Sequence, residues 1–127
     1  MTSERDLTRL LADIRPVLDP ETYVFCLVPP GAGVPAHLNP VQIFREPEGT
    51  TLILPLAEAK ATTFDHQFPC RMITLDVHSA LDAVGFLAAI TNLLAAAGIS
   101  VNAVSAYHHD HLFVPVERAD EAMRLLG

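Results

Sequence analysis

The feature that most constrains this chain is a long apolar pattern, over residues 83–97, that carries no charged residue. Apolar side chains recur there in steps of three and four, which is the spacing of one face of a helix. These positions are Ala83, Phe86, Leu87, Ile90, Leu93, Leu94 and Ala97. No Lys, Arg, Asp or Glu occurs between Ala83 and Asn102, although a solvated helix normally carries charges on its outer face. We therefore expect the second face of this helix to pack on another helix, either from the N-terminal half or from a second subunit.

Strand patterns flank this helix on both sides. Residues 72–77 alternate, which places Ile73, Leu75 and Val77 on one face of a strand. Gly98 is expected to end the helix as a left-handed cap. The expected elements that follow are a strand over residues 99–107, a tight turn over 108–110, a partner strand over 111–116 and a last helix from Glu117.

The N-terminal half is less regular, and its turns are marked by proline and glycine. Its expected elements are a helix over residues 3–18, strands over 23–28, 41–44 and 50–54, and a short helix over 56–63, followed by a junction over 67–70. Ser3 can cap the first helix, and Pro16 should end or kink it. The C-terminal half reads strand–helix–strand–strand–helix, so a split βαββαβ sandwich there lacks its last strand. We expect residues 23–28 to supply it.

The length, charge and cysteine content limit which partners and which cellular compartment we expect for this protein. A chain of 127 residues forms one compact domain or two half-size modules that share a core. The net charge of −7 repels nucleic-acid phosphates and anionic membranes, so we expect neither as a partner. No apolar run reaches the roughly 20 residues that span a bilayer, and the first residues lack the apolar core of a signal peptide. Cys26 and Cys70 are expected to be reduced thiols in the cytoplasm, with one disulfide as the alternative.

Two short motifs resemble those of the ACT domain, a small regulatory βαββαβ module. Residues 82–90, an acidic residue followed by Gly85 and an apolar helix start, are similar to the turn into the family's first helix. Residues 97–102, a helix stop followed by an apolar strand with Asn102, are similar to the entry to its second strand. Residues 77–79 and 106–115 resemble a largely uncharacterised group of small stand-alone bacterial proteins with two ACT-like halves.

The resemblance implies an α+β fold of ferredoxin-like βαββαβ modules. Antiparallel sheets would be covered by helices on one face, with strands shared between the halves. Residues 1–66 would form a divergent N-terminal half, and residues 67–127 a C-terminal ACT domain. The resemblance also implies a regulatory protein that binds a small amino acid or a related metabolite and performs no catalysis.

The loop before the long helix is the candidate ligand site. Backbone N–H groups at a helix start suit a ligand carboxylate, the carboxylate of Asp82 suits a ligand ammonium, and Gly85 permits close approach. In the alternative interpretation, Asp82 caps the helix with help from Ser79. The predicted binding residues are His78, Ser79, Ala80, Leu81, Asp82, Ala83, Val84 and Gly85, with Asn102, Ala103 and Val104 from the next strand as part of the wall.

Histidines and cysteines offer two weaker hypotheses. His108, His109 and His111 at a hairpin turn could hold a transition metal, but neighbouring strand residues point to opposite faces, so at most two, such as His109 and His111, share a side. Cys70, expected to be partly exposed, could act as a nucleophile, but the sequence identifies neither a base nor an oxyanion site for it. We therefore predict no catalytic residue, no metal and no cofactor.

The expected function is thus an amino-acid sensor that forms a homodimer and passes its signal to an unidentified downstream protein. The first alternative is a ligand-free structural or protein-interaction module that dimerises through the small-residue helix face. The second alternative is a metal-binding protein that uses the histidines.

Overall fold

The computed structural model describes residues 5–127, which form two compact units. Unit 1 combines the N-terminal segment through Pro20 with residues 71–127, and unit 2 holds residues 21–70. The division into residues 1–66 and 67–127 stays a prediction about the two sequence halves. The expected cap Ser3 lies outside the described residues.

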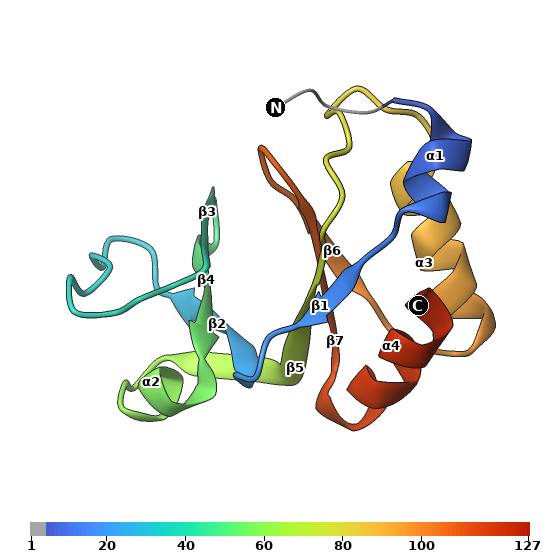
Figure 1. The fold of residues 1–127 in the computed structure, drawn as a ribbon. Coiled ribbons are helices and arrows are strands. Elements are labelled where there is room, and N and C mark those ends of the chain that lie inside the picture. Colours follow the sequence, from blue (N-terminus) through green and yellow to red (C-terminus); the bar gives the residue numbers. More distant parts are fainter. Residues whose placement is uncertain (1–4) are drawn as a thin grey trace. The chain divides into compact units, whose positions relative to one another are not determined.

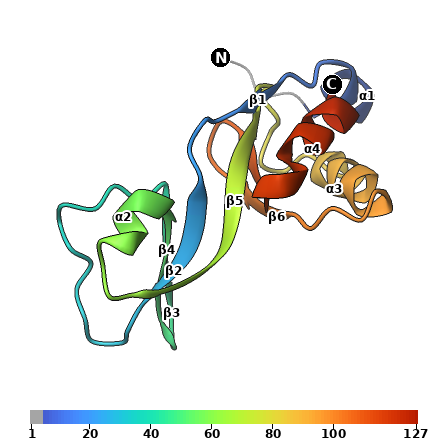
Figure 2. The same cartoon turned by 90° about the horizontal axis from the view of Figure 1, so that it is seen from below.

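Unit 1 packs three helices with an antiparallel sheet (Figure 1). Its elements are α1 (Leu7–Ala12), β1 (Pro16–Leu18), the second half of β5 (Asp65–Leu75), α3 (Phe86–Ala96), β6 (Asn102–Ser105), β7 (Asp110–Pro115), a 3-10 turn (Val116–Arg118) and α4 (Ala119–Leu126). In its sheet, β5 pairs with β1 and with β7, and β7 pairs with β6. The helices α3 and α4 contact each other, and Figure 2 shows them side by side.

The strand that completes the sheet of unit 1 is β1. The expected helix over residues 3–18 ends earlier, at Ala12, because Pro16 has a fixed φ and no N–H to donate. The chain then becomes extended, and Pro16 and Leu18 lie opposite Leu75 and Ile73 of β5. The prediction that residues 23–28 supply this strand is wrong, since they pair with the first half of β5 inside unit 2.

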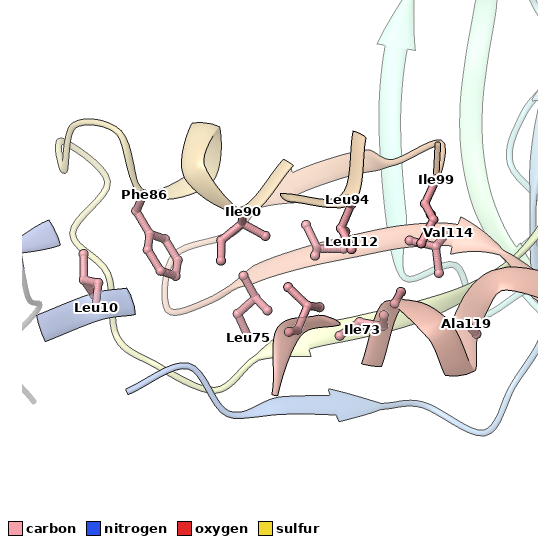
Figure 3. Close-up of a cluster of buried hydrophobic side chains, with 12 residues drawn as sticks. Leu10, Ile73, Leu75, Phe86, Ile90, Leu94, Ile99, Leu112, Val114 and Ala119 are labelled. Carbon is pink, nitrogen blue, oxygen red and sulfur yellow. The ribbon is translucent and has the colours of Figure 1, made fainter. Parts of the chain in front are cut away.

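The core of unit 1 lies between the helices and the sheet (Figure 3). Phe86, Ile90 and Leu94 point from α3 toward β5 and β7, as their spacing predicts. From the opposite side the core receives Ile73, Leu75, Leu112 and Val114, and from the other helices Leu10, Ala119, Ala122 and Leu126. The predicted inward face of residues 72–77 is confirmed, since Ile73 and Leu75 are fully buried.

Both ends of α3 depend on glycine. At the C-terminal end, Gly98 has a φ of 73°, and the N–H groups of Gly98 and Ile99 donate to the carbonyls of Ala95 and Leu94 at 2.9 and 3.0 Å. This is the left-handed cap expected of Gly98. At the N-terminal end, Gly85 is the N-cap with a φ of 90°, so the helix begins at Phe86, later than the sequence pattern indicates.

Part of the small-residue face of α3 stays exposed. The helix α1 contacts α3, but no contact of the expected kind covers the whole second face among the described residues. Ala88, Asn92, Ala95 and Ala96 nevertheless remain accessible to solvent.

Unit 2 is a sheet in the order β3–β4–β2–β5 with one short helix. Its elements are β2 (Tyr23–Val28), β3 (Gln42–Glu46), β4 (Gly49–Pro55), α2 (Leu56–Lys60) and the first half of β5. The expected hairpin is confirmed, with Phe44 opposite Thr51. Its core includes Val24, Cys26, Leu52, Leu54 and Ala59.

Residues 67–70, the expected junction, lie at the boundary of the two units, since unit 2 ends at Cys70, but they lie within the strand β5. Tyr23 pairs with Cys70 and Phe25 with Gln67, so the register shifts between them. Phe68 adopts a φ of 62° at this irregularity. A β-bulge tolerates a proline because the ladder there needs no N–H donor, which explains how Pro69 lies within a strand.

Candidate functional site

The loop between β5 and α3 leads into a helix whose first N–H groups receive no hydrogen bond from an N-cap side chain. Gly85 has no side chain, so the first N–H groups of α3 receive no hydrogen bond from their cap. The alternative in which Asp82 and Ser79 cap the helix is therefore wrong. The helix dipole favours an anionic group at such a helix start.

Asp82 is paired with a basic residue from the N-terminal segment. Its Oδ1 lies 2.8 Å from Nε of Arg5, and its side chain is 70% exposed. A pair this exposed contributes roughly 0–1 kcal/mol to stability. Both charges therefore stay available for exchange with a zwitterionic ligand at little cost.

A cavity of about 320 Å³ lies beside this ion pair. It is lined by Arg5, Ala80, Leu81, Asp82 and Tyr107. We name it the loop cavity. It brings one cationic and one anionic side chain together with apolar walls, which is the combination that a small zwitterion requires.

A smaller cavity of about 60 Å³ lies on the inner side of the same loop. Its lining residues are Ser79, Ala80, Leu81, Ala83, Phe86, Leu87, Ser105, Ala106 and Asp110. Its volume suits a few water molecules rather than a metabolite.

The predicted wall residues of β6 are not brought to these cavities. Asn102, Ala103 and Val104 are not among the residues that line either one. The strand contributes Ser105 instead, together with Ala106 just beyond its end. Val84, at 85% exposure, is also not among the lining residues.

Asp110 holds the loop to the β6–β7 hairpin, and the sequence interpretation missed this role. Its carboxylate accepts hydrogen bonds from Oγ of Ser105 at 2.6 Å and from Oγ of Ser79 at 3.1 Å. Asp110 is only 6% exposed, and buried carboxylates require such partners. Ser79 and Asp110 are 31 residues apart, so only the fold reveals the contact.

Four histidines gather at the tip of the same hairpin. The rings of His109 and His111 lie 6.3 Å apart by centroid, as their shared strand side predicts. The ring of His78, from the loop, lies 4.8 Å from His109 and 5.8 Å from His108. Over residues 5–127, no three His, Cys, Asp or Glu side chains are grouped so that they could hold a metal ion.

Both cysteines are buried thiols of unit 2. Cys70 is fully buried, not partly exposed as predicted, and its Sγ donates to the carbonyl of Tyr23 at 3.3 Å. Burial raises the pKa of Cys70 to about 12 and also raises the pKa of Cys26. Burial thus disfavours the thiolate, which is the reactive form, at both positions.

We expect both thiols to react with an aromatic disulfide reagent at least roughly a hundredfold more slowly in the folded protein than in denaturant, because each must be exposed and ionised first. The release of the coloured thiolate, followed at neutral pH with and without urea, measures this ratio. Rapid labelling of one thiol per chain without denaturant would contradict the assignment.

No helix among the described residues is long and apolar enough to cross a membrane.

Most of the chain is similar in structure to solved proteins. A protein of unknown function from Vibrio cholerae, described as a possible transport protein, is 41% identical over 93% of this chain and 91% of its own, with a TM-score of 0.82. A protein from Agrobacterium tumefaciens is 19% identical, with a TM-score of 0.74 over 89% of this chain and 86% of its own. The regulatory subunit of aspartate kinase from Thermus thermophilus is 10% identical, with a TM-score of 0.66 over 90% and 95%.

These likenesses confirm the α+β fold of tandem ACT-type modules. None of the curated proteins matches the chain. Two family models, each described as an ACT domain, match residues 2–71 and 67–127. Between them the two models cover nearly the whole sequence, and the chain therefore belongs to the ACT-domain family.

Proposed function

We propose that this protein reversibly binds a small amino acid in the loop cavity and performs no chemistry on it. The observation that carries the proposal is the pairing of Arg5 with Asp82 at the wall of a cavity of about 320 Å³. Membership of a family of regulatory modules supports it.

Each charged group of an amino acid has a partner at this loop. The ligand ammonium would replace the guanidinium of Arg5 at the carboxylate of Asp82. The ligand carboxylate would be bound by Arg5, which suits planar oxygen pairs. Leu81 and Tyr107 would contact the ligand's apolar part.

A larger hollow in unit 2 is less suited to this ligand. It has a volume of about 550 Å³ and is lined by Phe25, Cys26, Leu27, Thr51, Asp65, His66 and Gln67. These residues belong to paired strands, whose N–H groups largely serve the ladder rather than a carboxylate. Asp65 would also repel a ligand carboxylate.

The downstream signal would pass to a partner protein. A ligand shifts an equilibrium only by its differential affinity for two states, so binding must favour one arrangement of the loop. Leu81 at 68% exposure and Tyr107 at 80% flank the loop cavity, and they offer a partner a surface that changes when the ligand binds.

A ligand-free interaction module is the second candidate. The exposed small-residue face of α3, with Ala88, Ala95 and Ala96, favours a homodimer through this helix. Light scattering of the purified chain with and without amino acids separates the two candidates. A dimer that no amino acid affects would support the interaction module.

Thermal unfolding against the twenty amino acids tests the binding proposal. A ligand at a hundred times its dissociation constant adds about 2.7 kcal/mol. Selective stabilisation by one amino acid or a few similar ones supports the proposal, whereas no stabilisation by any of them contradicts it.

With the stabilising amino acid identified, we expect Asp82→Asn to weaken its affinity by roughly tenfold or more. The substitution removes the negative charge opposite the ligand ammonium, and hydrogen bonds to charged groups are worth about 1.5–3 kcal/mol, less where solvent screens them. Titration calorimetry measures the change.

Asp13→Asn is the matched control, since it removes the same charge from another exposed position of unit 1. It should leave the affinity within about twofold. If Asp82→Asn binds as tightly as this control, Asp82 does not contact the ligand.

A further inference from the structure

The four histidines at the hairpin tip come from two separate segments of unit 1. We call His78, His108, His109 and His111 the histidine cluster. His78 belongs to the loop that follows β5, whereas the other three belong to the β6–β7 hairpin. The ring contacts at 4.8 and 5.8 Å thus join the loop to the hairpin, next to the bond between Ser79 and Asp110.

Two carboxylates lie near the histidine cluster, and one of them is engaged in hydrogen bonds to serine hydroxyls. Oδ1 of Asp76 lies 3.3 Å from Nε2 of His109. Nε2 nevertheless has no hydrogen-bond partner among the described residues. The other carboxylate, Asp110, binds the hydroxyls of Ser79 and Ser105.

The other groups that contact the cluster are a hydroxyl and a phenol ring, and the ion pair of Arg5 with Asp82 lines the cavity that Tyr107 shares. Oγ1 of Thr74 on β5 lies 2.9 Å from Nδ1 of His111, and the ring of Tyr107 lies 4.9 Å from that of His108. The helix α3 brings no charged side chain. Of the carboxylates, Asp76 and Asp110 lie nearest to the imidazoles, whereas Asp82 is paired with Arg5.

We propose that the histidine cluster makes the attachment of the loop, residues 76–85, to the β6–β7 hairpin sensitive to pH. The loop is attached while the rings are neutral and is released once two or more of them are protonated. Solvated imidazoles titrate near pH 6.5, so the change falls in the mildly acidic range.

The direction follows from the balance of charges. The rings of His78 and His109 lie 4.8 Å apart by centroid, and two positive charges at this distance repel strongly where water is partly excluded. The nearest carboxylate, Asp76, has a 55% exposed side chain and lies 3.3 Å from Nε2 of His109, so solvent weakens its attraction for two positive rings. Moving the loop away relieves this repulsion.

His111 adds a contribution of the same sign. Burial above all, and the neighbouring His109, lower the pKa of His111, while Asp110 opposes them. At pH values between the lowered pKa of folded His111 and its unfolded value near 6.5, His111 binds more protons in the unfolded state than in the folded state. The stability associated with neutral His111 is therefore present above pH 6.5 and is lost as the pH falls.

Hydrogen exchange of the ligand-free protein tests the proposal without reference to amino-acid binding. Peptides that cover residues 76–85 are compared at about pH 7.5 and pH 5.5, with a chelator present and labelling times scaled for the intrinsic exchange rate. We expect the protection of this segment to fall roughly tenfold at the lower pH, while peptides from α3 stay protected.

His78→Phe keeps an aromatic ring at this position but removes its proton-binding site, so this variant should retain loop protection at both pH values. His37→Gln, at an exposed position of unit 2, is the matched control and should behave as the wild type. Asp76→Asn removes the compensating carboxylate and should move the release to a higher pH. Loop protection that is independent of pH in the wild type, or equally dependent on pH in His78→Phe, would overturn the proposal.

Discussion

Substitution of Gly49 by alanine is expected to lower the free energy of unfolding of unit 2 by about 3 kcal/mol or more. Gly49 begins β4 with a φ of 142°, a conformation that side chains other than glycine rarely adopt. A Cβ added there would lie 2.5 Å from the carbonyl oxygen of Val28 and 2.7 Å from Cδ1 of Leu27. The carbonyl cannot retreat easily, because Val28 pairs with Thr50 in the sheet.

Urea unfolding followed by circular dichroism measures this loss. Gly33→Ala is the matched control, since no atom lies within 4 Å of the added Cβ and no left-handed φ is required. It should change stability by about 0.5 kcal/mol at most. Equal midpoints for the two variants would show that the strands can separate at Gly49 without cost.

The second large effect is expected at Asp110. Asp110→Ala should lower the free energy of unfolding by about 2–4 kcal/mol, because the hydroxyls of Ser79 and Ser105 lose their acceptor in a largely buried place. The loss of a buried charge offsets part of this. The variant should also release the loop and weaken amino-acid binding, since Ser79 precedes Ala80 in the wall of the loop cavity.

Asp110→Asn separates the loss of hydrogen bonds from the loss of charge. Its amide keeps one acceptor oxygen, so it should be less destabilising than Asp110→Ala by about 1 kcal/mol. Ser100→Ala, at an exposed position, serves as a control for serine loss elsewhere in unit 1. If Asp110→Ala unfolds at the wild-type urea concentration, the carboxylate does not hold the loop.

The pairing of residues far apart in sequence could not be foreseen at the candidate site. Sequence spacing placed Asp82 near the start of a helix, and helix capping by a nearby Asp is the commonest local outcome. The partner of Asp82 is instead Arg5, 77 residues away. The role of Asp110 likewise depends on its hydrogen bond to Ser79, 31 residues away. The role of His78 depends on its ring contact with His109, which no local preference of the sequence dictates.

Local physical chemistry in the sequence determined the elements and their buried faces. The steps of three and four placed Phe86, Ile90 and Leu94 in the core, because a helix repeats every 3.6 residues. The β-branched and aromatic run of β2 gave its bounds, Tyr23–Val28, and Gly98 ended α3 because glycine tolerates a left-handed φ.

Only the tertiary structure decided how the strands are shared and where the charges meet. The sequence predicted a missing strand but assigned it to β2, whereas β1 pairs with Ile73 and Leu75. A three-residue strand carries too little pattern to be recognised alone, and its pairing is stable only because β5 provides the partner groups. The same reason holds for the continuation of β5 through Pro69, which requires a bulge opposite β2.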